Sequence, residues 1–326
     1  MPAFTVHLFG KFKAEYQARP LGELEAGKAQ ELFSYLLVHH GRAHAREALA
    51  ALLWGETATD KSKKYLRQAL WHLQTALDRP GAKLLAAEHD WVRLDLGDAL
   101  WLDVATFEQA CALAQGVRGR ELDDARRTGL SAAVALYRGD LLEGCYQDWC
   151  LYERERLQNL YLAALDKLLS HAAAYQDYEA GQTYGALLLR QDRAHERTHR
   201  QLMRLHYRAG DRTAALRQYE RCRAALRTEL DVEPAARTRL LYEQIRADRL
   251  DVAAPPPHAS SYAPDPAAPD ATAADAPAPT AATLPDVLVR LRQLQAVLTD
   301  AQQRVQHEIR AVELALKRKT QRILHR

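Results

Sequence analysis

The segment DKSKKYLRQALWHLQTAL, residues 60–77, decides how the N-terminal part of this chain folds. Four of its leucines recur at helical spacing and form one apolar stripe: Leu66, Leu70, Leu73 and Leu77. Cations, an amide, an imidazole and a hydroxyl occupy the opposite side, and Asp60 is suited to cap the first turn. Such side chains contact phosphates and base edges in a DNA major groove. An ordinary amphipathic surface helix shows the same pattern, so the neighbouring segments have to distinguish the two interpretations.

Short alternating stretches precede this helix. Residues 4–9 and 11–16 alternate on either side of Gly10, which predicts two strands, and a third short strand is expected at residues 20–21. The segments KAQELFSYLLVHHG (28–41) and HAREALAALLW (44–54) then predict two helices. Their inward-facing residues are expected to be Leu32, Tyr35, Leu36 and His39 in the first helix and Leu49, Leu52 and Leu53 in the second.

A hairpin is predicted after the helix over residues 60–77. Pro80 and Gly81 turn the chain, and KLLAAEHDWVRLDL (83–96) is typical of two strands with a bend at residues 88–90. A sheet, three helices and a hairpin are the order of a winged-helix domain. In that fold the third helix contacts DNA and the hairpin forms the wing.

Helix follows helix from Asp103 onward. The segment QDYEAGQTYGALL recurs as GDRTAALRQYERC, with Asp177 and Asp211 separated by 34 positions. This is the tetratricopeptide period, and the small residues Gly181 and Ala215 allow two helices of a repeat to approach closely. We expect a further helix from Glu233 onward and expect residues 148, 149 and 152 to pack the start of a long helix.

The C-terminal quarter of the chain differs in composition. Residues 253–283 are rich in proline and alanine and predict a disordered linker, because they carry too little apolar surface to fold. Residues 284–326 predict a coiled-coil helix whose stripe alternates spacings of three and four. We expect self-association through Leu284, Val287, Leu291, Leu294, Leu298, Val305, Ile309, Val312 and Leu316. The alternative is that this helix folds back on the repeat domain.

The overall composition is that of a globular protein. The 326 residues allow two or three domains, and 48% hydrophobic with 27% charged residues excludes a wholly disordered chain. We expect no membrane span and no signal peptide, and hence a cytoplasmic, nucleoid-associated protein. The formal net charge of +3 is small, so any DNA affinity must come from locally placed charge.

Several stretches resemble one known family: REALAALLW, KYLRQALWHLQTAL, DWCLYERERLQNLYLAALDKLL, ALRQYERC and ELDVEP. They are similar to bacterial transcriptional activator domain proteins, the group that includes the Streptomyces antibiotic regulatory proteins, over residues 4–247. The resemblance implies a winged helix joined to a tetratricopeptide-like activator domain, binding to direct repeats upstream of promoters, and contact with RNA polymerase. It also implies that residues 61–77 form the recognition helix and that Arg93 lies on the second wing strand. The family commonly has Ser-Arg-Leu-Arg where this chain reads Trp-His-Leu-Gln at 71–74, which removes two cations.

The expected fold is therefore mainly α, with four parts. An α+β winged helix-turn-helix domain is expected over residues 1–98 and an α-helical tetratricopeptide-like domain over 99–252. The linker and the coiled-coil helix complete the chain.

Candidate site residues follow from these assignments. The expected DNA contacts are Lys61, Lys63, Lys64, Arg67, Gln68, Trp71, His72, Thr75 and Arg93. A run of arginines suggests either an anion or partner patch or an ordinary solvated face: Arg190, Arg193, Arg197, Arg200 and Arg204. The residues His39, His40 and His44 suggest either a metal site or helix capping. The four cysteines, Cys111, Cys145, Cys150 and Cys222, lack zinc-site spacing and are expected to be buried free thiols.

The sequence favours a DNA-binding transcription activator. Its expected partners are double-stranded DNA, RNA polymerase and further copies of the chain, with a small effector left open. No catalytic residue, metal or cofactor is expected, because nucleotide-binding, metalloprotease and hydrolase motifs are missing. The alternative is an adaptor whose repeats bind a protein and whose winged helix does not read an operator. An enzyme would need a site that no residue pattern indicates.

Overall fold

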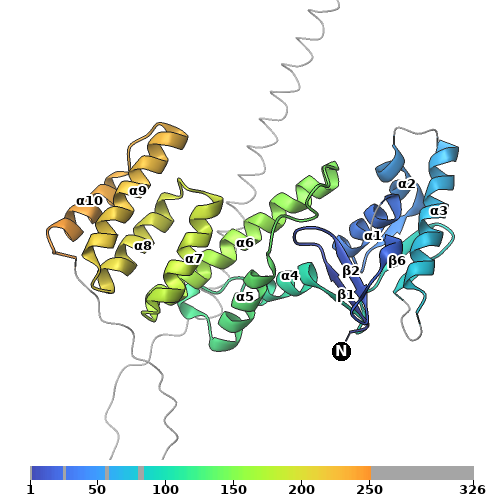
Figure 1. The fold of residues 1–326 in the computed structure, drawn as a ribbon, viewed down its shortest axis with the longest axis horizontal. Coiled ribbons are helices and arrows are strands. Elements are labelled where there is room, and N and C mark those ends of the chain that lie inside the picture. The colour runs from blue at the N-terminus through green and yellow to red at the C-terminus, as the bar shows by residue number, and fades with distance from the viewer. Residues whose placement is uncertain (1, 25–26, 56–58, 80–83, 251–326) are drawn as a thin grey trace, which may run out of the picture. The chain divides into compact units, whose positions relative to one another are not determined.

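The structure describes residues 2–24, 27–55, 59–79 and 84–250, and it is a computed structural model (Figure 1). The predicted linker at 253–283 and the predicted self-associating helix at 284–326 lie outside the described residues. The described part contains two small sheets and a long series of helices, as the sequence predicted for a mainly α protein.

The first sheet opens the chain and closes just before the helical part. Its strands are β1 (Phe4–His7), β2 (Lys13–Tyr16), β3 (Arg19–Pro20) and β7 (Leu100–Leu102). Their order is β3-β2-β1-β7, with β1 antiparallel to β2 and parallel to β7. The three N-terminal strands confirm the prediction. Strand β7 was not predicted, because three residues show no periodicity and its partner lies far away in the sequence.

Three helices follow, as predicted. They are α1 (Lys28–Val38), α2 (Arg46–Trp54) and α3 (Thr59–Leu77), preceded by a short 3₁₀ helix at Gly22–Leu24. Two details of the prediction were wrong. The side chain of Leu52 is 37% exposed, because Leu49 and Leu53 take the core-facing positions and Leu52 lies at the edge of their stripe. Helix α3 begins at Thr59, so Asp60 lies in the first turn and does not occupy the cap position.

The second sheet contains the wing. Strands β5 (Leu85–Ala87) and β6 (Trp91–Leu94) form the predicted hairpin, and β4 (Ala43–Ala45) adds to the other edge of β6. Strand β4 was not predicted, because its three residues carry no strand signal of their own. Its pairing with β6 fixes the wing against the connection between α1 and α2.

The helical part has the predicted repeat. Its helices are α4 (Asp103–Leu113), α5 (Asp124–Leu136), α6 (Asp148–Ala174), α7 (Tyr178–Gln191), α8 (Glu196–Arg208), α9 (Arg212–Leu230) and α10 (Ala236–Arg246). A 3₁₀ helix at Gly119–Glu121 lies between α4 and α5. Asp177 and Asp211 each cap the second helix of a pair, accepting a hydrogen bond from the backbone three residues later. Gly181 and Ala215 are buried at equivalent positions, which agrees with the close approach expected between the two helices of a repeat.

Backbone hydrogen bonds join the first sheet to the helical part. The amide of Leu142 donates to the carbonyl of Leu8, and the amide of Glu143 donates to that of Gly10. The guanidinium of Arg154, on α6, donates to the carbonyl oxygens of Leu141 and Leu142 and so holds this connecting loop. One hydrophobic core extends across the junction, so the N-terminal sheet is part of the scaffold that carries the helices.

Candidate nucleic-acid interface

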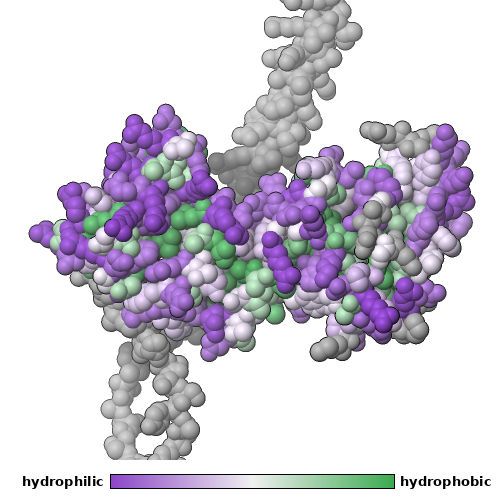
Figure 2. Space-filling view, viewed as in Figure 1, coloured by the Kyte–Doolittle hydropathy of each residue, from purple (hydrophilic) through white to green (hydrophobic). Residues whose placement is uncertain are grey.

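Helix α3 buries its leucine stripe and exposes most of its polar side chains. Leu66, Leu70, Leu73 and Leu77 are all buried, each 3% exposed or less. Eight of the nine predicted DNA contacts lie on this helix and all eight are exposed: Lys61, Lys63, Lys64, Arg67, Gln68, Trp71, His72 and Thr75. The edge formed by α3 is hydrophilic in the space-filling view (Figures 1 and 2). The geometry therefore leaves the polar face of α3 open to solvent.

One cation of this face has an ion-pair partner in the same domain. The ammonium of Lys63 lies 2.7 Å from a carboxylate oxygen of Glu47 on α2. This hydrogen bond raises the pKa of Lys63 and lowers the pKa of Glu47. Both groups are exposed, so the pair contributes little to stability. Among the described residues, Lys61 and Lys64 form no ion pair, so no neighbouring carboxylate neutralises their charge as Glu47 does that of Lys63.

The C-terminal half of α3 presents an aromatic surface. The side chain of Trp71 is 61% exposed and its ring lies 5.0 Å from that of His72. The hydroxyl of Thr75 donates to the carbonyl of Trp71 at 2.9 Å, so it offers mainly acceptor capacity to a ligand. A groove of about 390 Å³ lies between this end of α3 and strand β5, lined by Trp71, Gln74, Thr75 and Leu85 among others.

The wing presents a second set of side chains. Val92 and Leu94 of β6 are buried, so the alternating residues Trp91 and Arg93 face outward. The guanidinium of Arg93 donates to Asp95 at 2.9 Å, and Trp91 is 50% exposed. Trp91 was not predicted as a surface residue, although alternation along the strand places it on the same face as Arg93.

The predicted histidine cluster lies between α1 and α6. The ring of Tyr35 lies 4.5 Å from that of His39 and 5.2 Å from that of Trp149. Burial lowers the pKa of His39. Nδ1 of His40 lies 2.8 Å from the carbonyl of Leu37, and Nε2 of His44 lies 3.3 Å from the carbonyl of His39. The described residues hold no group of ligands suited to a metal ion, and these contacts fit helix capping and packing.

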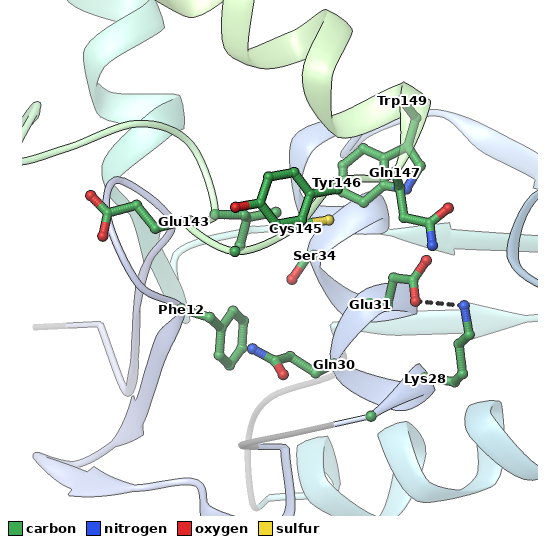
Figure 3. Close-up of a pocket in the computed structure, with 13 residues that line it drawn as sticks. Phe12, Lys28, Gln30, Glu31, Ser34, Glu143, Cys145, Tyr146, Gln147 and Trp149 are labelled. Atoms are coloured by element: carbon green, nitrogen blue, oxygen red, sulfur yellow. Dashed lines mark hydrogen bonds and ion pairs between the residues drawn. The ribbon is translucent and has the colours of Figure 1, made fainter.

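A cavity of about 430 Å³ lies beside this junction, between α1 and the loop that leads into α6 (Figure 3). The ammonium of Lys28 pairs with one oxygen of Glu31 at 2.7 Å. The buried atoms Glu31 Oε1 and Trp149 Nε1 have no hydrogen-bond partner among the described residues. Of residues 148, 149 and 152, only Trp149 packs as expected: Asp148 is exposed and Tyr152 is 76% exposed, because both face away from the core.

Two cysteines lie in the same loop and the start of α6. Cys150 is buried and Cys145 is half-buried in the wall of the cavity. The interaction between the two thiols lowers the pKa of Cys145 and raises the pKa of Cys150. All four cysteines are free, but only Cys150 and Cys222 are buried as predicted, since Cys111 also keeps part of its surface exposed.

The five arginines of the predicted patch do not act as one surface. Arg190 lines a hollow beside α5 and α7, whereas Arg197 lines another between α6 and α8. Arg197 pairs with Asp166 at 3.0 Å. Arg200 is mostly buried between Glu196 and Thr238, and Arg193 lies in the loop before α8. Burial lowers the pKa of Arg204, as do Arg200 and Arg208 nearby. The even spacing of these arginines in the sequence did not predict their separation in space. The segment that carries them includes the end of α7 and the turn before α8.

Comparison with known proteins identifies the helical part. The match to the bacterial transcriptional activator domain family covers residues 102–246. Those residues form a bacterial transcriptional activator domain. This match agrees with the resemblance predicted from the sequence over these residues.

A solved structure supports the architecture around the activator domain. The structure of Mycobacterium tuberculosis EmbR in complex with a low-affinity phosphopeptide is similar to the described fold, with a TM-score of 0.61. Sequence identity is 20%, and the match covers 77% of this chain and 67% of EmbR, so the likeness concerns the fold. No curated protein matches the chain. In the described part, no helix combines the length and apolarity needed to cross a membrane.

Proposed function

We propose that the chain is a sequence-specific DNA-binding transcription activator that inserts α3 into the major groove. The observation that supports this most is the division of α3 into a buried leucine stripe and an open polar face. Lys61 and Lys64 contact phosphates near the start of the helix, and Gln68 reaches a base edge one turn later. Because the net charge is only +3, this local placement of cations supplies the electrostatic attraction.

The wing adds contacts beside the helix. Arg93 and Trp91 extend from the same face of β6, and a winged helix places such side chains near the DNA backbone. Arg93 exchanges its ion pair with Asp95 for a phosphate.

The activator domain provides the contact with RNA polymerase. Exposed apolar side chains gather where α6 begins: Tyr146, Leu151 and Tyr152. Exposed aromatic residues are typical of the centres of protein interfaces, which supports this region as the polymerase contact. The proposed activator function does not require a small effector.

We also propose that copies of the chain associate through residues 284–326. Single DNA-binding modules bind non-specific DNA with dissociation constants of about 10⁻⁴ to 10⁻⁶ M. Joining two copies in one assembly raises the effective concentration of the second module to about the millimolar range. Sizing a chain truncated after Ala254, beside the full chain, tests whether the tail joins copies.

Genome-wide mapping of occupied DNA tests the main proposal. The wild-type chain is compared with a Lys61→Ala/Lys64→Ala/Gln68→Ala variant and with Lys11→Ala, an exposed lysine of the same domain that lies outside α3. We expect the triple variant to lose its specific sites and Lys11→Ala to keep them. Unchanged occupancy by the triple variant would show that α3 is not the reading helix.

The runner-up function is a protein adaptor. The exposed side chains at the start of α6 and the repeat architecture favour it, since repeat arrays offer extended binding surfaces. An adaptor of this kind would show no preference for any duplex at physiological salt, whereas the proposed activator would.

A further inference from the structure

A cationic hollow lies in the activator domain, away from α3. It has a volume of about 700 Å³ and is bounded by α6, α8 and the turn at residues 116–120. This volume is within the range of small-molecule sites in proteins.

Positive charge exceeds negative charge around this hollow. Five cationic side chains line it: Arg118, Arg120, Lys167, Arg197 and Arg208. Two carboxylates oppose them. Glu121 is shared by Arg118 and Arg120 at 3.7 and 3.4 Å, and Asp166 pairs with Arg197.

The cations differ in their availability to a ligand. The ammonium of Lys167 donates to the carbonyl oxygens of Ala114 and Val117 and is already used in the fold. Arg208 forms no ion pair with any described residue. Arg118 and Arg120 compete for a single carboxylate, so together they retain an unbalanced positive charge.

Two buried acceptors line the same hollow. Asp166 Oδ1 and Gln201 Oε1 have no hydrogen-bond partner in the part of the chain that the structure describes. The other oxygen of Asp166 accepts from Arg197 at 3.0 Å, and the amide nitrogen of Gln201 donates to the hydroxyl of Ser170 at 3.2 Å. Both side chains are therefore held in place with one acceptor left over. Buried polar atoms are usually paired, so these acceptors suit a ligand that donates hydrogen bonds.

We propose that this hollow binds a small phosphate ester that carries free hydroxyl groups, the chemistry shared by sugar phosphates and nucleotides. The phosphate lies against Arg118, Arg120 and Arg208, because guanidinium groups bind phosphate oxygens in a fork geometry. The hydroxyl groups donate to Asp166 and Gln201. The site lies wholly within the activator domain and does not depend on DNA binding by α3.

Calorimetric titration of the full chain without DNA tests the proposal. The probes are glucose 6-phosphate and ATP, with methyl phosphate as an ester lacking free hydroxyl groups and glucose as an uncharged control. We expect the hydroxylated esters to bind more tightly than methyl phosphate, and glucose to show no binding. Arg208→Gln should weaken ester binding by about tenfold, the effect of one charge-assisted hydrogen bond. Gln201→Leu should abolish the preference for glucose 6-phosphate over methyl phosphate.

A matched control variant distinguishes a specific ester-binding site from non-specific attraction to a positively charged surface. Arg217 is an exposed arginine on α9 that does not line the hollow, so Arg217→Gln should leave ester affinity unchanged. Thermal unfolding of each variant shows whether the fold is intact. Equal weakening by Arg217→Gln, or no binding of either hydroxylated ester, would overturn the proposal. Binding of an acidic peptide through Arg118 and Arg208, in the absence of ester binding, would overturn it in favour of a peptide groove.

Discussion

The carboxylate of Asp103 accepts a hydrogen bond from the backbone amide of Leu8 at 2.9 Å, across 95 positions of sequence. It also accepts from the amide of Phe9 at 3.0 Å and from that of Val104 at 2.7 Å. Asp103 begins α4, the first helix of the activator domain, and Leu8 follows the first strand. One side chain therefore joins the N-terminal sheet to the activator domain. This connection gives the scaffold that carries α3 a fixed attachment.

Replacing Asp103 with asparagine should destabilise the protein. The amide group retains one acceptor and turns a donor toward backbone amides, so we expect the free energy of unfolding to fall by about 1–3 kcal/mol. Denaturant unfolding of the full chain measures this. A variant as stable as wild type would show that these hydrogen bonds contribute nothing net.

The effect of Asp103 should also depend on pH. Burial raises the pKa of this carboxyl despite the three backbone hydrogen bonds and nearby His7. The folded state therefore holds the proton to a higher pH than the unfolded state does. The contribution of the protonated Asp103 carboxyl to the free energy of unfolding is full at low pH. It is lost as the pH rises through the pKa of this carboxyl in the folded state. The stability difference between wild type and Asp103→Asn should narrow over that range, and a constant difference would contradict the raised pKa.

Gly185→Ala should disrupt the packing of α7 on α8. A methyl group at Gly185 would lie 2.5 Å from Cδ2 of Leu202, which is too close. We expect a loss of about 1–3 kcal/mol in unfolding free energy, the usual result of overpacking. The same change combined with Leu202→Ala should cost less, because the obstructing atoms are removed.

Gly129→Ala is the matched control for this change. Gly129 lies in α5, and a methyl group there meets no described atom within 4 Å. Alanine should stabilise the helix by about 0.4–1 kcal/mol through the entropy of the unfolded chain. Equal destabilisation by the two alanines would mean that packing against Leu202 is not the cause.

Removing Lys61 or Lys64 should reduce the dependence of DNA binding on salt. Each phosphate contact releases counterions, so we expect the slope of log K against log salt to become shallower by about 0.9 for each lysine lost. Fluorescence anisotropy with an operator duplex and with an unrelated duplex measures both slopes. The weakening should be similar for the two sequences. Lys11→Ala should change neither slope, and a shift as large as that of Lys61→Ala would point to a diffuse charge effect.

Gln68→Ala should act on one base pair. A glutamine bonded to a base edge discriminates between base pairs by about 1–3 kcal/mol. Titration against a set of single-base operator variants should show lost discrimination at one position and unchanged binding to unrelated DNA. A uniform loss across all positions would instead assign Gln68 to the phosphate backbone.

Cys145 should react faster with alkylating agents than the other three cysteines. The neighbouring Cys150 thiol lowers the pKa of Cys145, so a larger fraction of Cys145 than of the other cysteines is the reactive thiolate at neutral pH. Mass spectrometry after timed iodoacetamide treatment measures the rate at each thiol. The rate at Cys145 should rise at a lower pH than the rates at the other cysteines, and Cys150→Ala should move this rise to higher pH. Faster labelling of the more buried Cys222 would contradict this assignment.

Local periodicity was enough to predict much of this fold. The leucine spacing of α3 and the alternation of β1 and β6 are patterns between residues close together in the chain. For the same reason the sequence predicted which side of α3 is exposed. Strands β4 and β7 could not be predicted, because each is three residues long and exists only through its distant partner.

The sequence by itself determined the three N-terminal strands, the helices that follow, the buried stripe of α3 and the family resemblance of the activator domain, because these depend on neighbouring residues. Only the tertiary structure decided which distant groups meet. In the tertiary structure the carboxylate of Asp103 accepts hydrogen bonds from the amides of Leu8 and Phe9. The arginines of the run at 190–204 lie in different surroundings, whereas Arg118 and Arg208 line the same hollow. Such contacts depend on how helices and strands pack across long stretches of sequence, and no local pattern encodes those distances.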